Sequence, residues 1–356
     1  MKRLLIAMAI SPAIHATGNP ASFDEFVSEN KNWTGIQLYK AEIATGAGNF
    51  DDASVHYINA IHTGLSQAAN NLALLIKDGK LSEDATLNAV RIVEKLAIND
   101  VELSNFLGDF YHTNETHGDH QQAFKWLNNS SRLGDISSKL LVAQYILAEK
   151  GGAHKVYTPI DGLTLLREYT TATNDPVVEL ELGKYLFEGK IVKRDYHLAA
   201  ELFNKSAESN VLEAHHWLGY QHEHGLGVTK NIKLAEENYL ASLGSSTDSD
   251  SYYQLSRIYM YGDNGLDGDY LLGVNYLTRS HELGNVKATY RFGIMNLYGS
   301  DGFNLDVRSG IKYLDEASEK GYRLATQKLI DVFRTGINGV SPSHSKVREY
   351  EKKLAK

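Results

Sequence analysis

Residues 214–225 read A-H-H-W-L-G-Y-Q-H-E-H-G, and variants of this tract recur along almost the whole chain. The apolar fifth residue and the final glycine return in the tracts that begin at 178, 251, 288 and 325, and weaker copies begin at 34, 68, 103 and 138. Successive copies therefore start 34 to 40 residues apart. A period in this range predicts a solenoid, in which each repeat buries its apolar face against its neighbours. The sequence thus predicts binding along an extended surface.

Each repeat has the pattern of two helices. In the first helix, Ala214, Leu218 and His222 lie four residues apart, which predicts one buried stripe. Gly219 lowers helix propensity by about 1 kcal/mol relative to alanine, and glycine recurs there at 108, 183 and 293, so we expect it to let the second helix approach closely. Small and large residues alternate at helical spacing in that second helix. No long period-two alternation predicts a sheet, so the expected fold class is all-α, with about nine antiparallel helix pairs.

Composition excludes several kinds of partner. The chain has 356 residues and a formal net charge of −8, and no basic cluster stands out along the sequence, so we expect no nucleic-acid binding. It contains no cysteine. Disulfides, thiolate metal sites, a cysteine nucleophile and a lipid anchor on an N-terminal cysteine are therefore not expected.

The first 16 residues have the order of a secretory signal peptide. A basic start, residues 1–3, precedes an apolar run at 4–10 and small residues up to Ala16. Cleavage is expected after Ala13 or Ala16, followed by a lead-in at 17–33 and repeats from 34 to 356. The apolar run is too short to span a membrane, which needs about 20 residues. We therefore expect an exported chain, periplasmic in a Gram-negative bacterium or otherwise secreted; the alternative is an N-terminal helix of a cytosolic protein.

The repeat beginning at Ala214 resembles the Sel-1-like repeat family, relatives of the tetratricopeptide repeats. It carries A-x-x-x-L-G, then G-L-G-V-T-K-N at 225–231, then L-A-x-x-x-Y-x-x-S-x-G at 234–244. The resemblance is strongest from 178 to 325. It implies a right-handed α-solenoid whose concave face is lined by the first helices, and adaptor or scaffold roles that are often found in bacterial envelopes. The segment G-N-F-D-D-A-S-V-H-Y at 48–57 also resembles the scaffold proteins of alginate export.

We find no catalytic constellation in the sequence. It lacks G-x-S-x-G, G-x-x-x-x-G-K-[ST] and H-E-x-x-H. Two histidine groups, at 215–224 and at 112–120, contain residue types that bind zinc or copper, but residues on one helix cannot all reach one ion, and polar loop residues explain the second group. The loop 263–269 is rich in oxygen ligands without the spacing of a calcium loop. We therefore predict no enzyme, no metal and no cofactor.

A binding face is better supported than a catalytic site. The third, seventh, tenth and eleventh positions of the first helices form one stripe away from the predicted core. Tyrosine and methionine, which are common at recognition surfaces, are frequent there. The predicted partner-binding residues are His216, Tyr220, Tyr253, Arg257, Met260, Tyr261, Tyr290, Ile294, Leu297 and Tyr298, with Glu223 and His224 in the same positions.

These observations favour a non-catalytic scaffold of the bacterial periplasm. It would hold an extended protein segment, or a glycan chain, in its concave groove as part of an envelope complex such as one that exports an exopolysaccharide. The alternative is a periplasmic or secreted regulator that captures a signalling or host protein. A metal enzyme built on the loop from His112 to His120 is a third and weaker hypothesis.

Overall fold

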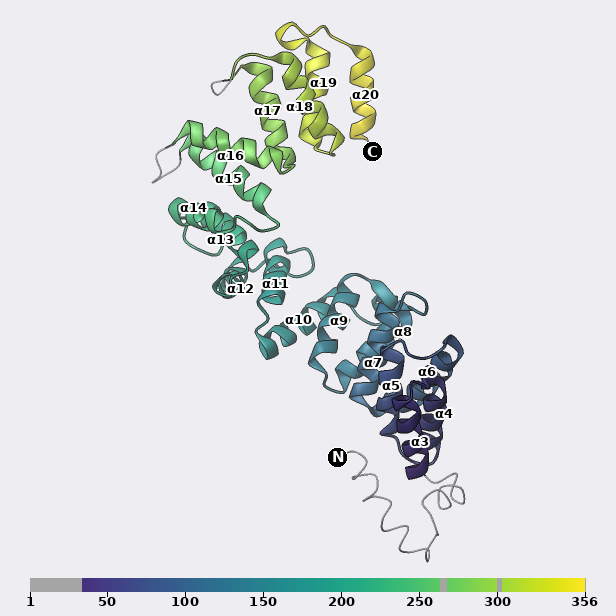
Figure 1. Cartoon of the computed structure of the whole chain (residues 1–356). Helices are drawn as coiled ribbons and strands as arrows, with labels where there is room; N and C mark the ends of the chain where they lie inside the picture. The colour runs from purple at the N-terminus through teal and green to yellow at the C-terminus, as the bar shows by residue number, and fades with distance from the viewer. Residues whose placement is uncertain (1–33, 263–267, 300–302, 356) are drawn as a thin grey trace, which may run out of the picture. The chain divides into compact units, whose positions relative to one another are not determined.

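The structure, a computed structural model, describes residues 34–262, 268–299 and 303–355 (Figure 1). The predicted signal peptide, the lead-in and residues 263–267 of the oxygen-rich loop lie outside the described residues. Every regular element among the described residues is a helix, which confirms the all-α prediction. In that part of the chain, no helix is both long and apolar enough to cross a bilayer.

The chain divides into two compact units, and the boundary along the sequence lies between Asn174 and Asp175. Unit 1 contains α3 (Thr34–Gly46), α4 (Phe50–His62), α5 (Ala68–Lys77), α6 (Glu83–Leu96), η1 (Ala97–Asn99), α7 (Val101–Thr113), α8 (His120–Arg132), α9 (Ile136–Leu147), η2 (Lys150–Lys155) and α10 (Pro159–Thr173). Unit 2 contains α11 (Pro176–Glu188), α12 (Tyr196–Glu208), α13 (Leu212–His224), α14 (Ile232–Ala241), α15 (Asp248–Tyr261), α16 (Tyr270–Glu282), α17 (Val286–Tyr298), α18 (Val307–Glu319), α19 (Arg323–Thr335), η3 (Ile337–Gly339) and α20 (His344–Leu354).

The α-helices of the described residues follow one another as nine pairs, from α3–α4 to α19–α20. We call the first helix of each pair helix A and the second helix B. In most pairs helix A packs more extensively on its own helix B than on any other helix. The pairing confirms the predicted helical-repeat architecture.

Capping residues explain where the helices begin and end. The Asp195 carboxylate accepts a hydrogen bond from the Leu198 amide at 3.0 Å, and Asn231 caps α14 through the Leu234 amide at 3.1 Å. Both satisfy amides that a helix start leaves without a partner. At the other end of α13, Gly225 takes φ +67°, a left-handed conformation that glycine adopts without strain.

The recurring glycine of helix A is a contact point between paired helices. A Cβ placed on Gly219 would lie 2.8 Å from Cδ1 of Tyr239, and one on Gly183 would lie 2.6 Å from Cε1 of Phe203. In unit 1, a Cβ on Gly108 would lie 2.6 Å from Cδ2 of Leu127. These distances are too short for any side chain, so the predicted close approach of the two helices is confirmed.

One predicted core position is wrong. His222 was expected in the buried stripe of α13, but its side chain is half-buried, with Nδ1 3.4 Å from the Thr229 carbonyl oxygen. The buried residue is its neighbour Gln221, whose Nε2 donates to the carbonyl oxygen of Tyr196 at 2.8 Å. Near the end of α13 the buried position is therefore one residue earlier than the spacing predicts. The polar side chain there is hydrogen-bonded to the first residue of α12.

Candidate functional site

Unit 2 presents tyrosines at the ends of two successive A helices. Tyr261 is the last residue of α15 and Tyr298 is the last residue of α17. Gly262 and Gly299 follow them, and Gly299 takes φ +59° so that the chain can leave the helix there. The two tyrosines remain 55% and 41% exposed, which makes them the most accessible aromatic residues of the predicted face.

Each of these tyrosine rings makes a cation–π contact with a basic side chain of the next A helix. The Arg291 guanidinium lies 5.2 Å from the ring centre of Tyr261, and Lys328 Nζ lies 5.7 Å from that of Tyr298. Such contacts contribute about 0.5–1 kcal/mol at exposed sites. Sequence reasoning missed the two cations, although each follows its tyrosine by thirty residues in the same repeat position. The contacts link α15 to α17 and α17 to α19, so the surface is continuous across these helices.

Other predicted residues lie beside these tyrosines and are partly engaged within the chain. The Tyr220 ring stacks on His224 with centres 4.1 Å apart, and Tyr290 meets Tyr322 edge-on at 5.2 Å. Lys287 Nζ lies 5.9 Å from the ring centre of Tyr253. Burial raises the pKa of Tyr290. We define the tyrosine face as Tyr220, Tyr253, Arg257, Tyr261, Tyr290, Ile294 and Tyr298.

Arg257 has a charged partner inside the chain. Its Nη1 donates to Glu223 Oε1 at 3.0 Å and to Gln254 Oε1 at 2.7 Å. The Tyr239 hydroxyl, on a fully buried side chain, donates to the other Glu223 oxygen at 2.7 Å. The carboxylate is only 8% exposed, so these hydrogen bonds offset much of the cost of burying its charge. Arg257 therefore has a structural role as well as its place on the face.

His216 and Leu297, which were predicted to contact a partner, are both buried within the chain. His216 is 8% exposed, and its Nδ1 is hydrogen-bonded to Ser251 Oγ at 2.7 Å. Burial lowers the pKa of this imidazole, with Asp250 the largest opposing influence. Leu297 is fully buried, and its backbone nitrogen lies 2.7 Å from the point where a Cβ of Gly310 would stand.

The tenth position of helix A packs against helix B, where Glu223 and Leu297 are buried and Met260 is half-buried. Met260 occupies it in α15, with Cγ 2.5 Å from the point where a Cβ of Gly273 would stand, and Glu223 occupies it in α13. Met260 was predicted to contact a partner, but in the structure it packs against helix B of its own pair. The accessible surface comes mainly from the seventh and eleventh positions.

The histidine groups are held by hydrogen bonds within the chain. His112 and His120 both contact the Tyr145 hydroxyl through Nδ1, at 2.7 and 3.0 Å. His215 Nδ1 contacts Asn238 Oδ1 at 2.9 Å. Across the described residues, no three histidine or acidic side chains are grouped so that they could hold a metal ion. These contacts supply a structural explanation for both groups.

Unit 1 has a pocket on its own A helices that sequence reasoning did not single out. It lies on α5 and α7, has a volume of about 670 Å³, and is lined in part by Leu74, Phe106 and Asp109. Burial raises the pKa of the Asp109 carboxyl. The repeat match is weaker in this half of the chain, so the positions that line the pocket could not be read from the pattern.

Comparisons with known proteins agree with the helix pairs. The pattern of the Sel1 repeat matches residues 105–135, 177–211, 212–242, 249–285 and 286–322. A Sel1 repeat protein from Oxalobacter formigenes has 21% sequence identity and a TM-score of 0.65, and the alignment covers 89% of this chain and 90% of that one. A protective antigen with an SLR fold, present in uropathogenic Escherichia coli strains, has 20% identity and a TM-score of 0.63, with 94% and 70% covered. At such identities the likeness concerns the fold.

Proposed function

This chain belongs to the Sel1 repeat family, and on that premise we propose that it is a non-catalytic scaffold of the bacterial periplasm. Sel1 repeat proteins are generally protein-interaction scaffolds. The tyrosine face of unit 2 would hold the partner, with Tyr261 and Tyr298 at its centre. The observation that carries the proposal is the exposure of these two rings, each beside a cation from the next helix.

The chemistry of the face suits an extended protein segment. Tyrosine rings offer a large contact area at a low cost in side-chain entropy. The neighbouring guanidinium and ammonium groups can donate hydrogen bonds to carbonyl oxygens of such a segment. The tyrosine–cation contacts recur from α15 to α19. A partner that extends across several helices could therefore contact each of them in turn. A glycan chain could also stack on these rings, and we treat it as the other outcome of the test.

A photo-crosslinking experiment tests the face. A photoreactive amino acid replaces Tyr261 in cells, and a control carries it at Leu271, which is 75% exposed on helix B of the same pair. We expect a defined protein adduct at position 261 and none at 271. Equal adducts at both positions, or none at 261, would contradict the proposed face. An adduct with an envelope or polysaccharide-export protein supports the scaffold, whereas a signalling or host protein supports the alternative regulator.

The periplasmic location rests on residues 1–16, with their basic, apolar and small-residue order. The place in an exopolysaccharide-export complex rests on the resemblance at residues 48–57 alone. Sequencing the N-terminus of the protein from periplasmic and cytosolic fractions tests the location. We expect a chain that begins after Ala13 or Ala16 in the periplasm. An intact Met1 in the cytosolic fraction would refute export.

A further inference from the structure

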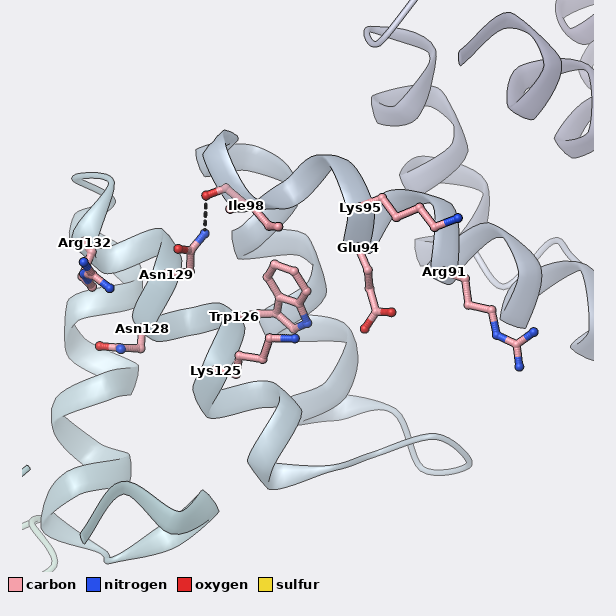
Figure 2. Close-up of a pocket in the computed structure, with 9 residues that line it drawn as sticks. All are labelled: Arg91, Glu94, Lys95, Ile98, Lys125, Trp126, Asn128, Asn129 and Arg132. Atoms are coloured by element: carbon pink, nitrogen blue, oxygen red, sulfur yellow. Dashed lines mark hydrogen bonds between the residues drawn. The ribbon is translucent and has the colours of Figure 1, made fainter. Parts of the chain in front are cut away.

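Two B helices of unit 1 form a basic pocket that the proposed function does not use. It has a volume of about 690 Å³ and lies between α6, with the η1 turn after it, and α8 (Figure 2). Arg91 and Lys95 lie one turn apart on α6, and Lys125 and Arg132 lie two turns apart on α8. Helical spacing therefore brings four cations from two different repeats to one opening.

These four cations have no anionic partner within the described structure. None of Arg91, Lys95, Lys125 and Arg132 forms an ion pair there. The single acidic side chain that lines the pocket is Glu94. The pocket thus carries an excess of positive charge in a chain whose formal net charge is −8. Uncompensated cations around one hollow raise the local concentration of anionic groups.

A buried donor without an acceptor lies at the centre of the pocket. Trp126 is 3% exposed, yet its Nε1 has no hydrogen-bond partner in the structure. A buried donor left in this state costs about 1–3 kcal/mol. Figure 2 shows the indole in the middle of the lining side chains, with its nitrogen on the side of Lys125. Lys125 Nζ lies over the same ring, 4.4 Å from its centre, so a cation and a donor without an acceptor are neighbours in the pocket.

Hydrogen bonds hold the walls of the pocket in place. Asn129 Nδ2 donates to the carbonyl oxygen of Ile98 at 3.0 Å and to Ser104 Oγ at 2.8 Å, which fixes η1 against α8. The Tyr111 hydroxyl donates to Glu94 Oε1 at 3.0 Å. The pocket is therefore preorganised, which lowers the entropic cost of binding.

We infer that the basic pocket of unit 1 binds a carboxylate side chain from an acidic segment of a protein partner. The carboxylate accepts the hydrogen bond of Trp126 Nε1 and pairs with Lys125, and the remaining cations attract the neighbouring acidic residues. Glu94 disfavours a phosphate, because a doubly charged group beside it meets more repulsion than a carboxylate does. Ile98, 59% exposed, offers apolar surface to the methylene groups of the ligand. This site goes beyond the proposed function and lies on other helices than the tyrosine face.

Isothermal titration calorimetry of the full chain with a hexaglutamate peptide tests the inference. We expect binding that weakens as salt rises, because the contacts are electrostatic, and no binding of a hexaglutamine peptide. An absence of binding to hexaglutamate, or equal binding of both peptides, would overturn the proposal. An oligonucleotide of the same charge is the third probe. If it binds more tightly than the peptide, the pocket recognises phosphate and the inference is wrong.

Three substitutions separate a specific pocket from general attraction. Trp126→Phe keeps an aromatic ring and removes the donor, so we expect roughly tenfold weaker binding. Lys125→Ala should weaken binding similarly, whereas Lys193→Ala, which removes an exposed lysine of unit 2, should change it less than twofold. Glu94→Gln should strengthen binding, because it removes the repulsion and keeps an acceptor for Tyr111.

The proposal fails if Trp126→Phe binds hexaglutamate as tightly as the wild type does. It also fails if Lys125→Ala and the control Lys193→Ala lose the same affinity, or if Glu94→Gln weakens binding. Thermal melts check that each variant is folded; should Trp126→Phe unfold, the Lys125 and Glu94 variants decide. Replacing Tyr261 and Tyr298 by alanine should leave hexaglutamate binding unchanged. A failure of the tyrosine face and a failure of this pocket are therefore distinguishable.

Discussion

The tyrosine face of unit 2 and the basic pocket of unit 1 use the same helix-pair repeat in opposite ways. On the tyrosine face, Arg291 and Lys328 lie over rings and Arg257 is paired with Glu223. In the basic pocket, four cations line the hollow that contains the buried Trp126, and none of these four forms an ion pair with a described residue. The first surface offers aromatic area and the second offers uncompensated charge. The repeat therefore fixes where side chains lie, while the residues at variable positions decide what the surface attracts.

The largest expected effect tests what the two units share, the close approach of helix A to helix B. Gly219→Leu in unit 2 should destabilise the protein by about 3 kcal/mol or more, because the new side chain meets both the Tyr239 ring and the Ala235 carbonyl oxygen. Gly108→Leu in unit 1 should have a similar effect through Leu127. Chemical denaturation measures both losses.

Gly46→Leu is the matched control for this pair of substitutions. A Cβ on Gly46, the last residue of α3, would have no atom within 4 Å, and its φ is not in the left-handed region. We expect a change of less than about 0.5 kcal/mol, as for other surface substitutions. Leucine has a higher helix propensity than glycine, so propensity cannot account for a loss. A loss at Gly46 equal to that at Gly219 would therefore mean that close packing does not set the effect.

The second prediction compares one carboxylate in each unit, Glu223 in unit 2 and Glu94 in unit 1, which differ in how deeply they are buried. Glu223→Ala should cost about 2 kcal/mol, because it leaves the buried Tyr239 hydroxyl without its acceptor. Glu94→Ala should cost less than about 1 kcal/mol, because Glu94 is only half-buried. The double variant Glu223→Ala with Tyr239→Phe should recover part of the loss. If it is as destabilised as the sum of the two single variants, the hydrogen bond contributes nothing.

The fold could be predicted because the residues that determine it repeat at a fixed spacing. Leu218 and Gly219 have equivalents that pack helix A against helix B, such as Gly108, Gly183 and Gly293. Gly225 has equivalents that end helix A in a left-handed conformation, such as Gly189 and Gly299. The binding face was harder to predict. His216 and Leu297 lie in the stripe that sequence reasoning assigned to the open surface, but helix B and the next helix A cover them. Spacing along one helix does not show where its neighbours lie.

The basic pocket could not be predicted from the sequence at all. Arg91 and Lys125 belong to different repeats, thirty-four residues apart, and neither stands in a run of basic residues. Only the packing of α6 beside α7 and of α7 on α8 brings them to one opening. The orphan indole nitrogen is likewise a property of burial and has no signature in the sequence.

The third prediction concerns partner binding at the tyrosine face. Replacing Tyr261 and Tyr298 together by alanine should weaken binding of the cross-linked partner by about 2 kcal/mol if the rings are anchors. The free energy of unfolding should change by less than about 1 kcal/mol, because both rings are exposed and lose one cation contact each. Calorimetric titration with the identified partner gives the first value and denaturation gives the second. Unchanged affinity would show that the rings lie outside the interface.

The smallest expected effect is a pH dependence of stability that belongs to unit 2. Burial holds the pKa of His216 below its ordinary value of 6.5. In the unfolded chain the imidazole takes up a proton near pH 6.5, whereas the folded chain resists protonation until a lower pH. Unfolding therefore binds a proton in this window, and stability falls as the pH drops below 6.5. His216→Gln should remove this part of the slope between pH 7.5 and 5, measured by denaturation at each pH. A slope that is the same in the variant would assign the dependence to other groups, and a wild-type protein that gains stability on acidification through this window would contradict the buried neutral imidazole.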